Sequence, residues 1–70
     1  MNLLALRQKM LEKQKSNKTL AFELGISRSA VQRKLSGKSE FSQGEIKVLA
    51  DILELSESEI MNIFFDQKVS

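Results

Sequence analysis

The sequence predicts an all-α fold, a compact bundle of five helices, and three observations support this prediction. Apolar residues recur at steps of three and four along the chain, which is the spacing of one helix face, and no segment alternates as a strand would. Proline is absent from all 70 residues. A chain of this length buries only about 60% of its unfolded surface, which suffices for one small core. We expect one domain over residues 1–66 and a tail over residues 67–70.

Two helices are expected in the first third of the chain. The first covers residues 3–15, and the second covers residues 17–24 with Ser16 as its N-cap. Gly25 ends the second helix, because the left-handed conformation that closes a helix favours a residue without a Cβ atom. The apolar residues expected to face inward are Leu3, Leu6, Met10, Leu11, Leu20, Ala21 and Leu24.

Three more helices are expected in the rest of the chain. The third covers residues 27–36 and ends at Gly37, and an extended connector containing Phe41 follows it. The fourth helix begins at Ser42 and the fifth at Ser56. The residues expected to face inward here are Val31, Leu35, Ile46, Leu49, Ala50, Leu53, Ile60, Ile63 and Phe64.

Composition disfavours catalysis and metal binding. The chain contains no cysteine and no histidine, which removes disulfides, thiolate zinc sites and the side chains most used as nucleophile or general base near neutral pH. The opening MNLLALRQK is too short in its apolar run for a signal peptide or a membrane span. We therefore expect a cytoplasmic protein that is not an enzyme and has no cofactor, no small-molecule ligand and no membrane partner.

Charge is distributed unevenly along the chain. Residues 1–38 carry nine basic and two acidic residues, a net charge of +7, whereas residues 39–70 carry two basic and seven acidic residues, a net charge of −5. One half of the molecule is therefore suited to meet an anion, although an inert solvated surface with a dipole would show the same asymmetry.

The predicted helix starts are of two kinds. Ser42-x-x-Glu45 and Ser56-x-x-Glu59 are capping boxes, in which the acid answers free N–H groups and the positive end of the helix dipole. The second and third helices lack such an acid, and their first turns instead contain a cation. A cation there is unfavourable by about 0.3–1 kcal/mol unless an outside anion binds at the same end.

Phosphate is the obvious anion for these two helix ends. Four caps that differ by chance would, however, give the same pattern. Lys38, which follows the third helix, is placed to contact a second phosphate. The residues expected to contact phosphate are Asn17, Lys18, Ser27 and Lys38.

The exposed side of the third helix is suited to reading base pairs. On a helical wheel Val31 and Leu35 fall together, while the polar residues fill a separate arc of about 140°. This arc contains no carboxylate. Arginine offers a bidentate fork to guanine, glutamine does the same for adenine, and serine serves either role. The candidate base-reading residues are Arg28, Ser29, Gln32 and Arg33, and a solvated helix face is the alternative interpretation.

The stretch from residue 17 to residue 35 resembles the helix-turn-helix of small phage repressors and Cro-type proteins, in the xenobiotic-response-element-like family of regulators. That family places a small residue in the middle of its second helix, a glycine at the turn four residues later and a branched apolar residue six further on, and Ala21, Gly25 and Val31 occupy those places. LGIS before the third helix and SGK after it are also typical. The resemblance implies a lambda-repressor-like domain whose third helix lies in the major groove.

Four positions depart from the family pattern. Asn17 replaces the glutamine that usually opens the second helix and contacts phosphate. Met10 and Leu35 stand where many relatives have an Arg–Glu pair, and since such pairs can be exchanged for packed apolar residues, we expect these two side chains to touch. Lys34 occupies a position that is commonly apolar, so we expect either that it snorkels or that the helix is slightly rotated.

Some apolar residues exceed what the predicted core requires. Phe22 is expected to pack against the first helix or the connector, with a partner contact as the alternative, and Phe41 is expected to anchor the connector. Phe65 and Val69 are candidates for a dimer interface, because the last helix cannot bury every apolar residue near its end.

Taken with the resemblance, these features predict a sequence-specific regulator that binds double-stranded DNA. We expect a repressor that occupies a pseudo-palindromic operator as a weak homodimer stabilised on DNA, since one recognition helix covers too few base pairs to select an operator. A Cro-type protein and a fragment of a longer repressor both fit. The alternatives are a protein-interaction module, such as an antitoxin or antirepressor, and the DNA-targeting part of a recombinase or transposase.

Overall fold

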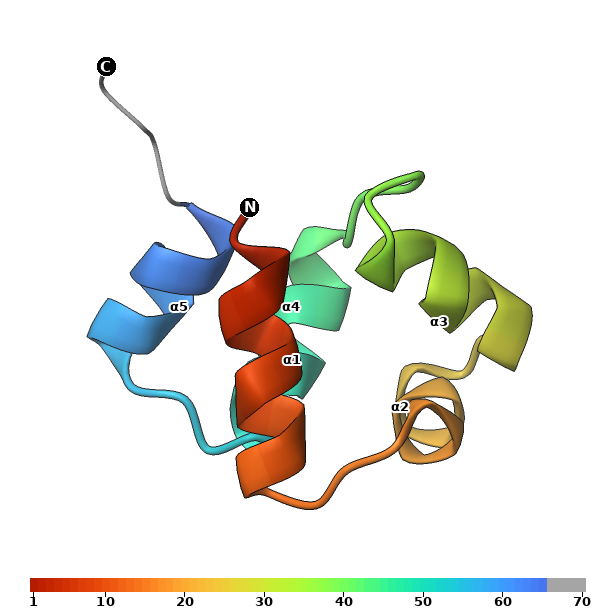
Figure 1. Ribbon diagram of the computed structural model, residues 1–70, viewed down its shortest axis with the longest axis horizontal. Coiled ribbons are helices and arrows are strands. Elements are labelled where there is room, and N and C mark those ends of the chain that lie inside the picture. Colours follow the sequence, from red (N-terminus) through yellow and green to blue (C-terminus); the bar gives the residue numbers. More distant parts are fainter. Residues whose placement is uncertain (66–70) are drawn as a thin grey trace.

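The computed structural model describes residues 1–65 and shows five helices, without a strand, in that range (Figure 1). This confirms the predicted all-α fold. Val69 and the predicted tail lie outside the described residues. Across residues 1–65, none of the helices combines the length and the apolar character that a membrane span requires. The helices are α1 (Leu3–Glu12), α2 (Asn17–Leu24), α3 (Arg28–Leu35), α4 (Gln43–Ile52) and α5 (Glu57–Phe64).

The helices surround one apolar core. α2 packs against both α3 and α4, and α1 packs against α5, so α1 stands between the α5 side and the α2–α3 side of the molecule (Figure 1). The core side chains are Leu6, Met10, Leu20, Ala21, Val31, Leu35, Phe41, Leu49, Leu53, Ile63 and Phe64. Most inward-facing residues expected from the sequence lie in this core or pack on its edge.

The connector between α3 and α4 is held by an aromatic pair. Phe41 is buried, and its ring meets the ring of Phe64 edge to face, with 6.0 Å between the centroids and 85° between the planes. This geometry places the positive edge of one ring against the negative face of the other. Phe41 therefore anchors the connector, as predicted.

α1 ends earlier than predicted, at Glu12 instead of residue 15. The chain turns at Gln14, which adopts a left-handed φ of 56°, and the N–H of Lys15 then donates to the carbonyl of Met10 at 2.8 Å. A left-handed residue that closes a helix is usually glycine, and here it is glutamine. The end of α1 consequently carries no sequence signal.

Leu11, which was expected to face inward, and Phe22, which was expected to pack against the first helix or the connector, are both exposed, so these two predictions were wrong. Leu11 is 79% exposed, because Leu3, Leu6 and Met10 already define the inward side of α1 and residue 11 is rotated away from it. Phe22 is 84% exposed, because the inward stripe of α2 runs through its neighbours Leu20 and Ala21. Phe22 therefore packs against neither the first helix nor the connector.

Candidate nucleic-acid interface

The turn between α2 and α3 begins at a left-handed glycine. Gly25 has φ of 70°, its N–H donates to the carbonyl of Phe22 at 3.3 Å, and the N–H of Ile26 donates to the carbonyl of Ala21 at 3.1 Å. These bonds satisfy carbonyl groups at the end of α2 and turn the chain sharply toward α3. The two helices pack against each other directly after the turn. The result is a helix-turn-helix over residues 17–35.

Serine caps open both helices of this motif. The Oγ atom of Ser16 accepts from the N–H of Thr19 at 3.2 Å, and the Oγ atom of Ser27 accepts from the N–H of Ala30 at 3.0 Å. Neither first turn contains an acid. Within residues 1–65, the two N–H groups that follow each serine have no hydrogen-bond partner. These helix ends thus keep free donors and a positive dipole end facing solvent.

The start of α4 is closed by its own acid. The carboxylate of Glu45 accepts from the N–H of Ser42 at 2.8 Å, and the Oγ atom of Ser42 accepts from the N–H of Glu45 at 3.1 Å. Lys34 of α3 adds an ion pair to the same carboxylate at 3.1 Å. Partial burial raises the pKa of Glu45, but the Ser42 N–H and the Lys34 ammonium outweigh this effect and leave the pKa below its ordinary value.

The start of α5 is closed in the same way. Glu59 accepts from the N–H of Ser56 at 2.8 Å and forms an ion pair with Lys9 of α1. The Lys9 ammonium, followed by the Ser56 N–H, lowers the pKa of Glu59 to about 2. Both predicted capping boxes are confirmed, and each acid also joins its helix to a lysine on a different helix.

α1 is a third helix whose first turn lacks an acid, which the sequence reasoning did not consider. Its cap Asn2 accepts from the N–H of Ala5 at 3.0 Å, and the Asn2 N–H donates to the carbonyl of Ile63. The first turn of α1 is apolar and contains no cationic side chain. Among the five helices of residues 1–65, only α2 and α3 combine an acid-free first turn with a cationic side chain.

The predicted base-reading residues share the exposed side of α3. Val31 and Leu35 are buried on the opposite side, as the helical wheel predicted. Among residues 1–65 the side chains of Arg28 and Arg33 form no ion pair. The exposed candidates are Arg28, Ser29, Gln32 and Arg33. Their contacts with bases stay predictions.

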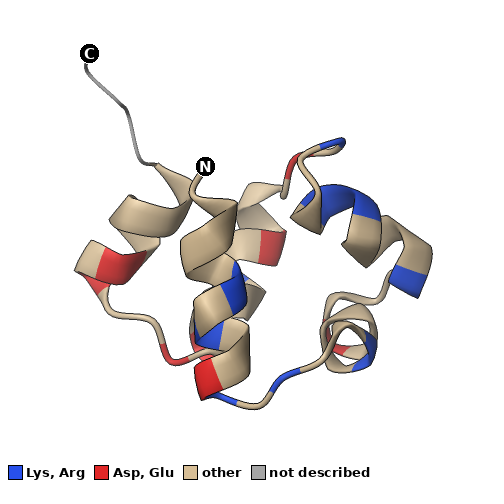
Figure 2. Cartoon of the chain, viewed as in Figure 1, with Lys and Arg blue, Asp and Glu red and all other residues tan. Residues whose placement is uncertain are grey.

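The predicted phosphate contacts lie around this helix. Lys18 is exposed on the first turn of α2, Ser27 is the exposed cap of α3, and Lys38 lies in the exposed loop after α3. Asn17 is half-buried, and its Nδ2 atom donates to Oε1 of Gln32 at 3.1 Å. Figure 2 shows Lys and Arg on α1, α2, α3 and the loop after α3, and acids on α5 and at the start of α4, with further acids on α1, on α2 and in the loop after α3.

Lys34 connects α3 to the rest of the domain. Its Nζ atom donates to the carbonyl of Glu40 at 2.9 Å, pairs with Glu45 and lies 5.7 Å from the centroid of the Phe41 ring. Only 16% of its side chain is exposed. The expected snorkelling is confirmed, because the stem is largely covered while the ammonium finds three partners at the edge of the core.

Met10 and Leu35, whose side chains are expected from the sequence to touch, are both buried in the same core cluster. This placement agrees with the predicted apolar replacement. A cation is nevertheless present nearby, because an Nη2 atom of Arg7 donates to the carbonyl of Leu35 at 3.3 Å. The contact joins α1 to the carboxyl end of α3, where a positive charge is favourable. Sequence reasoning missed it, since the two residues are 28 positions apart.

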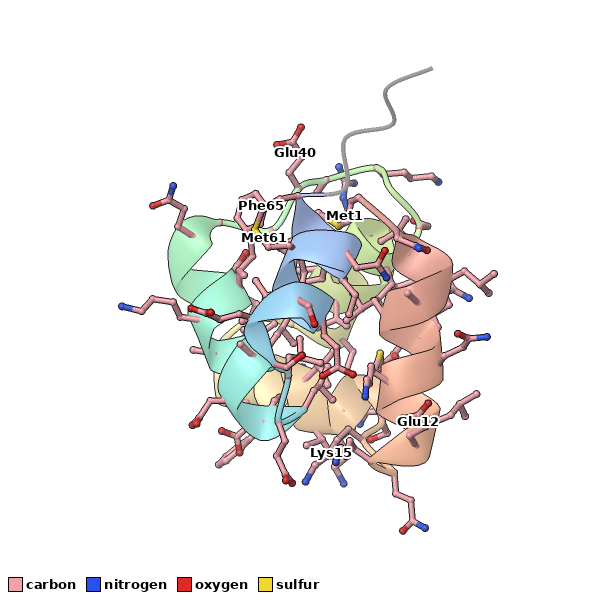
Figure 3. The ribbon with its side chains drawn as sticks, turned by 90° about the vertical axis from the view of Figure 1, so that its left-hand side faces the viewer. Met1, Glu12, Lys15, Glu40, Met61 and Phe65 are labelled. Atoms are coloured by element: carbon pink, nitrogen blue, oxygen red, sulfur yellow. The ribbon has the colours of Figure 1, made fainter. Side chains whose placement is uncertain are left out.

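An apolar groove lies between α4 and α5, away from α3. It has a volume of about 550 Å³, and its apolar lining includes Ile46, Ala50, Ile60 and Phe65. Phe65 is 46% exposed and Met61 is 58% exposed, and Figure 3 shows the two side chains projecting next to each other at one end of α5.

Comparison with known proteins identifies the family. The profile of the helix-turn-helix family of the Cro/C1 type matches residues 6–60, which is well over half of the chain. No curated protein and no solved structure matches the sequence. The family consists of DNA-binding, non-catalytic domains that regulate transcription. The chain therefore belongs to the Cro/C1-type, xenobiotic-response-element family of helix-turn-helix DNA-binding domains.

Proposed function

We propose that the protein is a repressor that blocks transcription by occupying a specific operator in double-stranded DNA. The observation that supports this most directly is the contrast between helix ends. The two helices of the helix-turn-helix keep open, electropositive N-termini beside an acid-free arc, whereas α4 and α5 are closed by their own glutamates. A surface of this kind attracts the phosphate backbone and leaves the arc facing the groove.

In this arrangement α3 enters the major groove with its N-terminal turn toward the base edges. Arg28 and Arg33 each present two parallel N–H donors, which match the O6 and N7 acceptors of guanine. Ser29 donates or accepts at a neighbouring base. Lys18 and Lys38 neutralise phosphates at opposite ends of the motif, and Asn17 and Ser27 contact the backbone at the two helix starts.

We further propose that two copies bind together through the groove between α4 and α5. Pairing is required because one recognition helix covers too few base pairs to define a site in a genome. Two helices related by a two-fold axis and about 34 Å apart would read a pseudo-palindrome. The exposed Phe65 beside an apolar groove supports this surface, and its modest size fits a weak dimer that forms chiefly on DNA.

Selection of bound duplexes from a random pool, at a stated salt concentration, tests the proposal. We expect enrichment of one pseudo-palindromic sequence whose half-sites are centred one helical turn apart. Phe65→Ser should weaken binding to the full operator and leave binding to an isolated half-site unchanged. A protein that retains no duplex and remains monomeric would contradict the proposal and favour the protein-interaction alternative.

A further inference from the structure

A second surface hollow borders the proposed DNA-binding face. It has a volume of about 430 Å³ and lies between the carboxyl half of α1, the loop to α2 and the side of α3. Asn17 and Gln32 belong both to its wall and to the predicted DNA contacts, so the hollow is continuous with that face. Its lining residues are Arg7, Met10, Leu11, Lys15, Ser16, Asn17, Gln32 and Leu35.

The charge of this hollow is one-sided. Arg7 and Lys15 line it, and no carboxylate does. The hollow on the opposite side of α1 differs, since there Lys9 is neutralised by Glu12 at 3.4 Å and by Glu59. Neither Arg7 nor Lys15 forms an ion pair within the described part of the chain. The hollow therefore complements an anion, and the one on the other side of α1 does not.

Several donors in the hollow remain available. A guanidinium has five N–H donors, and Arg7 uses one of them on the carbonyl of Leu35. Gln32 accepts from Asn17 through Oε1, and both N–H bonds of its Nε2 atom have no partner among residues 1–65. Lys15 lies just beyond the end of α1 (Figure 3) and adds an ammonium. Cationic and amide donors around an apolar floor suit a singly charged phosphodiester.

We propose that this hollow binds a DNA phosphate next to the one held at the start of α2, so that α1 is a third DNA-contacting helix. Arg7 and Lys15 neutralise this phosphate. Gln32 is a positioning residue that orients the Asn17 amide and donates to the backbone, and it does not read a base. This inference rests on the proposed function, because it adds contacts to the same complex.

Salt-dependent binding measured by fluorescence anisotropy tests the inference. Arg7→Gln and Lys15→Gln should each weaken binding about fivefold at physiological salt and lower the slope of log K against log salt by about 0.9. Both losses should be equal on operator and random duplexes. Lys13→Gln is the matched control, because Lys13 is a nearby cation that pairs with Glu54 at 3.9 Å outside the hollow, and it should leave the slope unchanged.

Gln32→Ala separates the backbone role from base reading. We expect it to weaken binding to operators that differ at single base pairs by one common factor. A changed preference at one base pair would instead assign Gln32 to base reading and overturn its part of the inference.

The outcome that overturns the hollow as a phosphate site is distinct from failure of the proposed function. If the wild-type protein shows no salt-dependent retention of DNA, the proposed function fails. If the wild-type protein binds DNA, but Arg7→Gln and Lys15→Gln show the same slope of log K against log salt as the control Lys13→Gln, the hollow is not a phosphate site and the proposed function still stands. A lower stability of Arg7→Gln with an unchanged slope would assign Arg7 to holding α3 alone.

Discussion

The starts of α2 and α3 differ from the starts of α4 and α5 in the residue that stands three positions after the cap. All four helices have a serine cap that accepts from the N–H three residues later. That third residue is Thr19 or Ala30 in the first pair and a glutamate in the second pair. The glutamates return to the cap and also bind lysines from other helices. The first pair of helix ends therefore has no negative side chain at its positive end, while in the second pair a glutamate binds the cap N–H and supplies that charge.

In this chain, the two helix starts with a glutamate contribute to folding stability, and the two without one leave the helix end available to an anion. An acid at the third position contributes to the free energy of folding through the dipole and the cap, typically by about 0.3–1 kcal/mol. The helix-turn-helix forgoes this gain at both helices and carries a cation, Lys18 or Arg28, elsewhere in each first turn. A binding surface maintained in this way costs stability, and α4 and α5 have no such requirement.

The largest expected effect is on base recognition by α3 of the helix-turn-helix, whose start carries no acid. Arg28→Ala or Arg33→Ala should reduce operator binding by about 1–3 kcal/mol and relax the preference at particular base pairs, because a bidentate contact to guanine is lost. Competition with operators changed at single positions measures this effect. An equal loss on operator and random DNA would show that the two arginines act only on the backbone.

The next effect concerns the stability of the capping box at the start of α4. Glu45→Ala should lower the free energy of unfolding by about 1–2 kcal/mol, because the start of α4 loses its cap and Lys34 loses its ionic partner. Urea unfolding measures the change. Glu23→Ala, which removes an exposed glutamate without an ion pair among residues 1–65, should change stability little. Equal losses in the two variants would mean that the closed cap contributes nothing.

A smaller effect is expected for the lysines beside the open ends. Lys18→Ala or Lys38→Ala should weaken binding to all duplexes alike and lower the salt slope by about one unit, since each removes one phosphate contact. Titrations at several salt concentrations measure the slope. A loss confined to one sequence would contradict the assignment of these residues to phosphate.

The smallest effect is a pH dependence of the unfolding free energy, which arises from Glu59 in the capping box of α5. The Lys9 ammonium and the Ser56 N–H hold the pKa of Glu59 at about 2, below its ordinary value of 4.5. The stabilisation is complete above about pH 4.5 and is lost as the pH falls toward 2, because the unfolded chain takes up the proton first. In Glu59→Gln the unfolding free energy should fall less steeply over this range. An unchanged slope would show that the pair contributes no pH-dependent stability.

Local signals made much of this fold predictable from the sequence. Ser16, Gly25 and Ser27 set the limits of α2 and the start of α3, since caps and a left-handed glycine act on adjacent residues. The end of α1 was not predictable, because Gln14 closes the helix where glycine is the usual signal. Phe22 was misplaced because its exposure depends on how α2 packs.

The candidate site was predictable where it depends on one helix and not where it depends on packing between helices. The exposed arc of α3 follows from its periodicity alone. The hydrogen bond of Asn17 to Gln32 and that of Arg7 to the Leu35 carbonyl join residues 15 and 28 positions apart, so no local pattern reveals them. The hollow beside α1 became visible only in three dimensions.

The central claim is that the start of α2, which lacks an acid, receives a DNA phosphate. Building a capping box like those of α4 and α5 at the start of α2 tests this claim most directly. Thr19→Glu creates a capping box behind Ser16, and Thr19→Gln creates the same box without the charge. Denaturant unfolding and DNA titration should show that Thr19→Glu folds at least as stably as the wild-type protein and binds DNA about three- to tenfold more weakly, while Thr19→Gln binds nearly normally. Undiminished DNA binding by Thr19→Glu would contradict the claim that the open end of α2 receives a phosphate.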